Sequence, residues 1–569
     1  MSGIRFFGVW DYVVLVFVLA ISTTIGLYYR FTGGKQKTVK EYLLADSDMS
    51  VTPVAFSLMA SFMSAITLMG VSSENYTYGF QFIVINISYL IFTPIAAYLY
   101  LPIFYKLQTM SAYEYLERRF GKVSRLVASL SYSLQMILYM GIVLYAPALT
   151  LEALTDISKI TAILTVGLVC TFYSTIGGMK AVLMTDFFQS LLMFAAVFSV
   201  IICAIMDKGS ISEIWRICVD GNRTDLLNFN PDPTVRHSWF SLIIGGGITF
   251  LSLYAVNQTQ VQRYLTLRDL KKAQTALWLN WPILTILSLT TSFSGLAIYS
   301  KYYKCDPVSN GTIRSLDQIM PYYVVDSMGH IPGISGLFVS GIFSATLSTV
   351  SSAMNCLAAV TIEDYVKPLY LHCKGKSLSD NRSPLYTKLI AFLNGCVCII
   401  LAFVAQYLGD VLQASLTIFG VVGGPLLGLF TLGMFSRIPN EMGALGGFFI
   451  GLAISLWIAF GGPKPQLPKL PMRIDGCNAS LESFLNVSIV KPTELDKMDH
   501  FWLYRISYLY NGVIGLFVTV LVGYAISLLL RQFLEQNNIY LDSNLFFPFI
   551  SSKHEKENDK NKSEVLFLM

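Results

Sequence analysis

Long apolar stretches separated by short polar segments dominate the chain. Most are about 20 to 30 residues long, which matches helices that cross a lipid bilayer rather than the shorter apolar runs of a soluble core. The pattern therefore predicts an all-α polytopic membrane protein with thirteen transmembrane helices. They are expected at residues 10–29, 51–73, 80–104, 126–148, 159–177, 182–206, 238–258, 275–299, 331–360, 387–407, 412–435, 441–460 and 506–530.

Composition agrees with a protein that uses the lipid bilayer as its solvent. The 569 residues are 54% hydrophobic and 13% charged, with a mean hydropathy of +0.57, whereas a soluble protein is about a quarter charged. The net charge of +5 is modest and does not indicate a nucleic acid partner. Nine cysteines and five histidines show no metal-binding spacing, so no metal centre of that kind is indicated. Nothing in the pattern indicates an obligate protein partner.

The distribution of basic residues predicts the orientation in the membrane. Clusters follow the first, third, seventh and ninth expected helices, which makes those loops cytoplasmic, the N-terminus extracellular and the C-terminal tail cytoplasmic. The tail, residues 531–569, is polar and is expected to be disordered. The basic residues are Arg30, Lys35, Lys37, Lys40, Lys106, Arg118, Arg119, Lys122, Arg125, Arg263, Arg268, Lys271, Lys272, Lys367, Lys374, Lys376 and Arg382.

The loops on the other side carry features of an extracellular surface. Cys218, Cys305 and Cys477 lie there, where a disulfide can form, and the sequence leaves their pairing open. Further sequons on the predicted inside and within a helix make the glycosylation pattern supportive rather than decisive. The predicted glycosylation sites are Asn222, Asn310, Asn478 and Asn486, and the other sequons are at Asn86, Asn381 and Asn561.

Two expected helices carry residues that disfavour a continuous helix. The run Gly245 to Gly247 lowers helix propensity by about 3 kcal/mol relative to alanine, although close helix packing is the alternative reading. The stretch 51–73 has Pro53 at its start and the small polar run 60–65 halfway. Paired broken helices at matching positions of two inverted five-helix repeats indicate a midplane binding site. The repeats are expected at residues 51–206 and 238–436.

A hydroxyl-lined helix face in the stretch 341–355 supplies candidate ion ligands. At 100° per residue, Gly341, Ala345, Ser348, Thr349 and Ser352 share one stripe, opposite an apolar face. Sodium prefers oxygen ligands, and a broken helix frees carbonyls. We expect Ser348 and Thr349 to bind sodium. The alternative is that these hydroxyls only bond to the preceding turn or allow close helix contact. The predicted sodium ligands are Ala60, Met63, Ala345, Ser348 and Thr349.

An acidic residue within the sixth expected helix is a second candidate. Asp186 lies six residues from Lys180, about 9 Å along a helix. An intramembrane acid is by default a functional-site hypothesis, so Asp186 is expected to attract sodium into an inward exit route. A salt bridge with Lys180 or a loop arginine is the alternative.

Several stretches together make the chain resemble the sodium:solute symporter family. These are ASFMSAITLMGVSSENYTYG (60–79), SAYEYLERRFG (111–121), GGMKAVLMTDFFQ (177–189), VNQTQVQRYL (256–265), FSATLSTVSSAMNCLAAVTIEDYVKP (343–368) and GPLLGLFTLGMF (424–435). They are most similar to the multivitamin, monocarboxylate and iodide branch. The resemblance implies a LeuT-like fold, sodium as the coupling ion, the same five sodium ligands, and Asp186 as the family's exit acid.

The resemblance also guides the choice of solute. Phe62, Thr67 and Asn86 stand where sugar carriers place amide, imidazole or carboxylate groups, so a small organic anion or iodide is favoured over a sugar. Biotin, pantothenate and monocarboxylates are such anions. The expected solute contacts are Phe62, Thr67, Asn86, Tyr254 and Thr417, and Ser64 and Tyr145 are expected to serve a second sodium.

These observations together predict a plasma-membrane symporter that imports a small, anionic solute with Na⁺ by alternating access. A non-transporting sodium or solute sensor, or a leak channel on the same fold, is the alternative, and no catalytic motif indicates an enzyme. The expected organisation is an extracellular N-terminus, first helix and cytoplasmic loop (1–50), repeat one (51–206), an extracellular loop (207–237), repeat two (238–436), two further helices with an extracellular loop at 462–505 (437–530), and a cytoplasmic tail (531–569).

Overall fold

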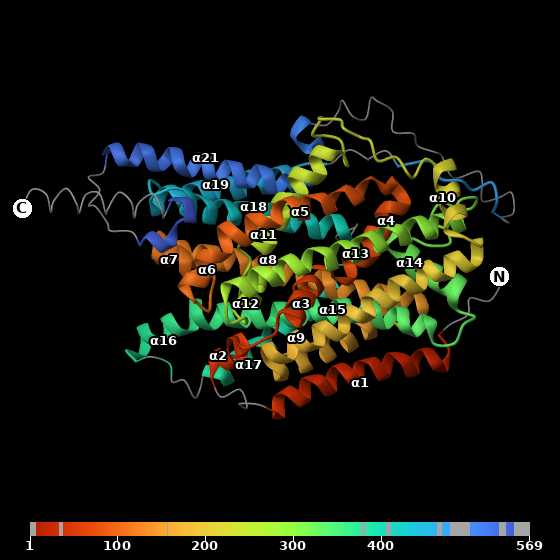
Figure 1. Cartoon of the computed structure of the whole chain (residues 1–569), viewed down its shortest axis with the longest axis horizontal. Helices are drawn as coiled ribbons and strands as arrows, with labels where there is room; N and C mark the ends of the chain where they lie inside the picture. Colours follow the sequence, from red (N-terminus) through yellow and green to blue (C-terminus); the bar gives the residue numbers. More distant parts are fainter. Residues whose placement is uncertain are drawn as a thin grey trace, which may run out of the picture.

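The protein is an all-helical bundle (Figure 1). The computed structural model describes residues 7–32, 38–155, 157–376, 378, 383–405, 411–463, 469–477, 501–533 and 542–550, and these contain no strand. Within them, ten helices are long and apolar enough to cross a membrane, or up to twelve when each of two bent pairs counts as one span. The fifth expected span, residues 159–177, corresponds to the shorter apolar helix Lys159–Phe172, so the all-α class is confirmed and the count of thirteen is not.

The helix boundaries follow the apolar stretches closely. The α-helices are α1 (Val9–Phe31), α2 (Val39–Leu44), α3 (Val51–Phe62), α4 (Ala65–Tyr78), α5 (Ile85–Ile95), α6 (Leu101–Leu107), α7 (Glu114–Arg119), α8 (Lys122–Leu154), α9 (Lys159–Lys208), α10 (Ile211–Asp220), α11 (Gly246–Tyr254), α12 (Gln258–Tyr264), α13 (Leu270–Tyr302), α14 (Ile319–Tyr323), α15 (Ile334–Val360), α16 (Lys367–Lys374), α17 (Ser383–Ala405), α18 (Val411–Phe435), α19 (Glu441–Phe460) and α21 (Tyr510–Phe533). Short 3-10 or π segments include η3 (Ala96–Tyr100), η4 (Ser241–Gly245), η7 (Thr361–Val366) and η10 (Ser543–Leu545).

Helix α15 lies at the centre of the bundle and packs against α9, α8, α1 and α3. Almost every residue of α15 is buried, as expected for a helix surrounded by other helices. Small residues permit this close approach. A Cβ on Gly341 would lie 2.3 Å from the Cβ of Ala196 on α9. Helix α9 itself changes direction at Gly178, whose φ of 66° interrupts it between the two expected spans.

The first broken helix has its break where the small polar run predicted one. Helices α3 and α4 meet at an angle of 60°, and Met63 and Ser64 lie between them. Met63 has φ −84° and ψ 86°, outside the helical region, so the carbonyls at the end of α3 lose their partners within the helix.

The second broken helix is bent at a different place from the one predicted. Helix α11 continues through Gly246 and Gly247, and the 59° bend follows Tyr254. The glycines instead allow close packing, because a Cβ on Gly247 would lie 2.0 Å from the Phe92 ring. Asn257 begins the next helix, where its side chain accepts a hydrogen bond from the Thr259 amide at 2.9 Å. The expectation of unwinding at Gly245–Gly247 is therefore wrong.

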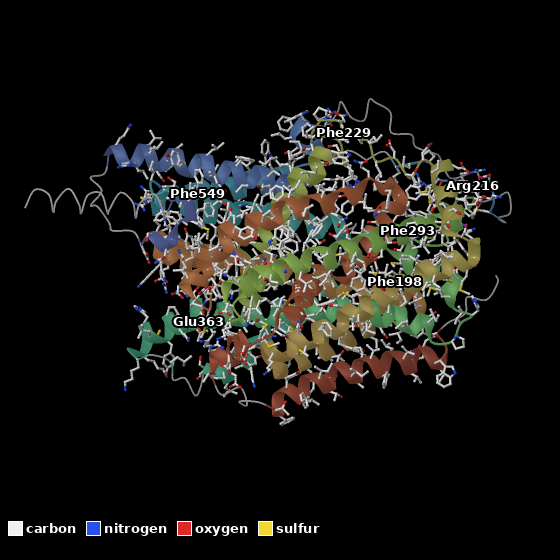
Figure 2. All side chains as sticks on the ribbon, in the orientation of Figure 1. Phe198, Arg216, Phe229, Phe293, Glu363 and Phe549 are labelled. Carbon is white, nitrogen blue, oxygen red and sulfur yellow. A yellow bond between two sulfur atoms is a disulfide. The ribbon has the colours of Figure 1, made fainter. Side chains whose placement is uncertain are left out.

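The two ends of the bundle differ in how they are tied together. A disulfide joins Cys305 to Cys477, and we call this the disulfide end; Arg216 on α10 lies there (Figure 2). Cys218 is a free, buried thiol, which removes it from the candidate pairs. Asn222 and Asn310 are exposed at this end, whereas the sequons at Asn478 and Asn486 lie outside the described residues.

The opposite end, where α21 finishes and Glu363 lies in Figure 2, is called the tail end. Part of the C-terminal tail is folded there, which corrects the expectation of disorder for the nine residues from Asp542 to Ile550. Phe547 donates its amide to the Met434 carbonyl at 3.0 Å, and Tyr115 donates its hydroxyl to the Leu545 carbonyl at 3.1 Å. The side chains of Leu545, Phe546 and Phe547 are buried, and the Phe546 ring lies under the guanidinium of Arg119. These three apolar side chains anchor the segment.

Candidate functional site

The break between α3 and α4 faces the hydroxyl stripe of α15. Ser348 donates its hydroxyl to the Ala60 carbonyl at 3.0 Å, and Thr349 Oγ1 lies 3.5 Å from the same oxygen. Both hydroxyls also contact the Ala345 carbonyl, at 3.1 and 2.9 Å. All of these residues are buried, as is Met63 at the break itself. The fold therefore brings four of the predicted sodium ligands, Ala60, Ala345, Ser348 and Thr349, into contact, with Met63 at the adjoining break.

The spacing of these oxygens bears on whether one cation fits among them. Oxygens about 2.4 Å from an ion of calcium's size, which sodium approximates, are about 3.4 Å apart at adjacent octahedral positions. The contacts from Ser348 and Thr349 to the carbonyls of Ala60 and Ala345 span 2.9 to 3.5 Å. Neutral oxygens at this spacing are suited to a monovalent cation. The alternative, in which the hydroxyls of Ser348 and Thr349 only bond within their own helix, also has support, because each of them contacts the Ala345 carbonyl in the preceding turn.

Ser352, one turn after Ser348 on the hydroxyl stripe of α15, contacts a buried ion pair that includes Asp186, the predicted exit acid. Arg263 Nη2 lies 3.2 Å from Asp186 Oδ2, and both side chains are fully buried. The Arg263 guanidinium also donates to Ser57 at 2.8 Å and to Ser352, while Ser57 donates to Asp186 at 2.5 Å. Asp186 thus has an arginine partner, the alternative that the sequence left open. Lys180 instead lies near the Tyr29 ring.

Arg263 lies in a different environment from the one predicted. The charge pattern assigned it to a cytoplasmic loop, but it belongs to α12, the second half of the second broken helix, and it is fully buried. The error arose because α12 is short and polar, so its sequence carries no apolar signal of a helix inside the bundle.

A central cavity of about 70 Å³ lies beside the first break. Phe62 and Thr67 line it, as predicted for solute contacts. The other three candidates lie elsewhere. Asn86 lines a separate groove with Trp239 and Trp281, because it points away from the cavity on α5.

Tyr254 and Thr417 are buried outside the cavity lining. Tyr254 packs against the Phe62 ring, with 5.6 Å between centroids, and donates its hydroxyl to the Leu58 carbonyl at 3.2 Å. Thr417 is buried on α18, where Ser415, Leu416 and Phe419 face the cavity instead.

Several residues lining the cavity were missed. They comprise amide, hydroxyl and aromatic side chains from both broken helices and their neighbours. Gln260 is the most informative, because its amide nitrogen donates to the Leu58 carbonyl at 3.2 Å while its buried Oε1 has no hydrogen-bond partner in the described residues. The stretch VNQTQVQRYL (256–265) held this signal, because it places several polar residues at the end of an expected membrane helix. The missed residues include Tyr89, Tyr139, Asn257, Thr259, Gln260, Ser288, Ser415 and Phe419.

The pair proposed for a second sodium is not brought together around one site. Ser64 Oγ lies 3.4 Å from the Thr67 hydroxyl, close to the start of α4. Tyr145 lies further along α8, where Lys159 approaches its ring at 5.7 Å. Tyr139, nearly two turns before Tyr145, is the α8 tyrosine that lines the cavity with Thr67.

Comparison with known proteins identifies the family. The profile described as "Sodium:solute symporter family" matches residues 42–451. The chain belongs to the sodium:solute symporter family. A Drosophila melanogaster protein provisionally named a sodium-dependent multivitamin transporter is 54% identical over 559 residues, covering 96% of this chain and 92% of that protein. Human sodium-coupled monocarboxylate transporter 1 is 44% identical over 549 residues, covering 92% and 88%.

A solved structure extends the similarity to three dimensions. The substrate-bound, outward-open state of a Na⁺-coupled sialic acid symporter matches with a TM-score of 0.74 and 25% identity, covering 92% of this chain and 98% of that one. The predicted LeuT-like fold is confirmed. This symporter is a sodium-coupled membrane transporter for a small-molecule solute, and it is not an enzyme.

Proposed function

We propose that this symporter imports a small carboxylate anion, a monocarboxylate or a carboxylate vitamin such as biotin or pantothenate, together with sodium. The observation that carries the proposal is the contact of the Ser348 and Thr349 hydroxyls with the Ala60 carbonyl, beside the central cavity. The names of the multivitamin and monocarboxylate relatives support this solute class, because both groups include carboxylates. The plasma membrane is the proposed location, with the disulfide end and the N-terminus extracellular and the C-terminus cytoplasmic.

Coupling follows from the position of the ion ligands across the break. A cation bound between Ala60 on α3 and Thr349 on α15 fixes the angle between a broken helix and an unbroken one. The next residues along α3, Ser61 and Phe62, line the solute cavity. Sodium binding therefore shapes the cavity wall, and a ligand shifts the outward-facing and inward-facing states only by its difference in affinity for them.

Energetics favour more than one sodium for each anion. A tenfold sodium gradient is worth about 1.4 kcal/mol, and about 60 mV adds about 1.4 kcal/mol for each net charge moved. One sodium with a monoanion is electroneutral and supports only about tenfold accumulation. Two sodium ions with one anion support about a thousandfold accumulation and carry an inward current. Solute-evoked current in voltage-clamped cells separates the two cases.

The double substitution Ser348→Ala with Thr349→Ala tests the sodium site. We expect it to abolish sodium-dependent uptake in a panel of biotin, pantothenate, lactate, iodide and glucose, while surface labelling shows normal delivery to the membrane. Thr346→Ala is the matched control, because Thr346 is a buried hydroxyl on the same helix that donates to the Ile342 carbonyl at 3.2 Å, within its own helix. Normal uptake with unchanged sodium dependence in the double variant contradicts the assignment. Solute-evoked current without accumulation of labelled solute identifies a channel or sensor instead.

Asp186 is proposed to help sodium leave toward the tail end. Ser352, one turn from Ser348 on α15, shares Arg263 with Asp186, so the ion pair lies next along the stripe from the sodium ligands. We expect Asp186→Asn to slow turnover by about tenfold or more while the apparent affinity for solute changes less. Rates of sodium-dependent uptake and of solute exchange measure the two effects separately. An unchanged turnover removes Asp186 from the exit route.

A further inference from the structure

A second buried ion pair lies near the disulfide end, outside the sodium and solute site. Arg236 donates from Nε to Glu74 Oε1 at 2.6 Å and from Nη2 to Glu74 Oε2 at 3.1 Å. Its Nη1 donates to the Gln413 side chain at 3.1 Å. Glu74 is 4% exposed and Arg236 is 8% exposed. The pair therefore connects α4, the segment before η4, and the start of α18.

This ion pair separates two cavities. A cavity of about 840 Å³ at the disulfide end is lined by Tyr78 and Arg236, among other residues. The central cavity is lined by Val71 and Leu412. Glu74 lies between Val71 and Tyr78 on α4, and Gln413 directly follows Leu412. A solute that moves along α4 from the large cavity to the central cavity therefore passes this contact.

Arg236 is held by a part of the protein other than the helix that carries Glu74. Ser507 donates its hydroxyl to the Arg236 carbonyl at 2.9 Å, and the Tyr508 ring lies 5.0 Å from the guanidinium. The Tyr78 ring lies 4.5 Å from the guanidinium and belongs to α4 together with Glu74. When α4 moves away, Arg236 keeps its backbone anchor and one aromatic face, and its planar fork is released for another carboxylate.

We propose that the Glu74–Arg236 pair is the closed form of an outer gate, and that Arg236 binds the carboxylate of an incoming solute in place of Glu74. The proposal rests on the proposed function, in which a carboxylate enters from the disulfide end. Among the described residues, the lining of the central cavity includes no lysine or arginine, whereas Arg223, Arg236 and Arg505 line the large cavity. Of these three, Arg236 is the one that pairs with Glu74 on α4, the helix that also lines the central cavity. A bidentate contact of 2.6 and 3.1 Å to Glu74 shows that the fork already accommodates a carboxylate.

The test uses a cysteine introduced in place of Val71, on the cavity side of the ion pair. Cells expressing the full chain with Val71→Cys are treated with the membrane-impermeant methanethiosulfonates MTSES, which is anionic, and MTSET, which is cationic. Protection against later maleimide labelling gives the modification rate, and the chain without Val71→Cys supplies the background from native cysteines. We expect Glu74→Gln to raise the rate at the introduced thiol by about tenfold or more with both reagents, because the closed state loses its ion pair.

Charge selectivity then tests the role of Arg236. In the Glu74→Gln background the unpaired guanidinium favours MTSES over MTSET, and adding Arg236→Gln lowers that preference several-fold while labelling stays fast. An unchanged rate in Glu74→Gln overturns the gate. Fast labelling with the same reagent preference with and without Arg236 overturns the anion contact.

Two further measurements keep the test decisive. If Glu74→Gln fails to reach the surface, Glu74→Asp keeps the charge but shortens the side chain by one methylene, and its labelling rate is expected to lie between those of the parent and a fully open gate. Equal rates in Glu74→Asp and the parent then overturn the gate. The labelling assay needs no transport, so gated labelling of the Val71→Cys thiol in a chain that accumulates none of the panel solutes contradicts the proposed function and leaves the gate supported.

Discussion

Two buried ion pairs lie on opposite sides of the candidate site, and they are built differently. The pair near the disulfide end, Glu74–Arg236, is bidentate and bridges α4 to the segment before the second broken helix. The pair toward the tail end, Asp186–Arg263, has one contact of 3.2 Å and shares its charges with Ser57 and Ser352. With their side-chain partners counted, the disulfide-end pair connects three segments beside a large cavity, whereas the tail-end pair connects four helices.

The two ion pairs are expected to differ in the free energy needed to separate their charges. Arg236 borders a cavity of about 840 Å³, so water can solvate it when the Glu74 contact breaks. Arg263 and Asp186 are fully buried, and Asp186 Oδ1 has no partner in the described residues. Separating these charges without water carries a large desolvation penalty. The disulfide end is therefore expected to open more readily than the tail end when no sodium is bound.

Breaking the tail-end pair is expected to give the largest effect. Arg263→Met leaves the Asp186 carboxylate buried without its cation, which destabilises a protein by about 3–5 kcal/mol. We expect little folded protein at the cell surface and a clearly lowered unfolding temperature in detergent. The matched control combines Arg263→Met with Asp186→Asn, which removes both charges and is expected to recover most of the stability. Equal loss in both variants means that packing around Arg263 matters and its charge does not.

Breaking the disulfide-end pair is expected to destabilise the protein less. Glu74→Gln leaves Arg236 beside the large cavity and between two aromatic rings, and we expect a loss of about 1–3 kcal/mol. Thermal unfolding of the purified variant, measured beside Arg263→Met under the same conditions, gives the comparison directly. A loss as large as that of Arg263→Met shows that water in the cavity does not solvate Arg236 once Glu74 is replaced, and the proposed asymmetry fails.

The sequence predicted the architecture correctly where a pattern is typical of only one structural feature. Apolar length located the membrane helices, and the 100° stripe located Ser348 and Thr349 opposite Ala60, because helix periodicity fixes which side chains share a face. The glycine run had two meanings, unwinding and close packing. Only the position of Phe92, distant in sequence, shows that packing is the correct one.

The ion pairs were harder to predict because their partners are far apart in the chain. Glu74 and Arg236 each lie just beyond the end of an expected helix, where a charged residue ordinarily faces water or a headgroup. Arg263 was counted as a loop cation, since a count of basic residues does not distinguish a buried arginine from an exposed one. Three of the predicted solute contacts, Asn86, Tyr254 and Thr417, are close in sequence to residues that line the cavity. Their own side chains are not among the residues that line it.

The smallest expected effect distinguishes the two pairs by pH. His237 lies 3.2 Å from Glu74 and 3.3 Å from the Tyr508 hydroxyl, whereas the side chains bonded to the tail-end pair are hydroxyls. Burial, together with the Arg236 guanidinium, lowers the pKa of His237 well below its usual value, so the imidazole is neutral in the folded protein at pH 7.

The sign of the pH effect follows from that lowered pKa. Below about pH 6.5 the unfolded chain binds a proton at His237 that the folded protein does not, so stability is present above this pH and falls as the pH decreases, by up to about 1.4 kcal/mol per pH unit. We expect His237→Gln to lose less stability than the parent between pH 7.5 and 5.5, measured by thermal unfolding. His330→Gln is the control, because it removes an exposed imidazole that lies outside both ion pairs. A His237→Gln variant with the full acid loss shows that the pH sensitivity comes from elsewhere, which makes the two pairs equivalent in this respect.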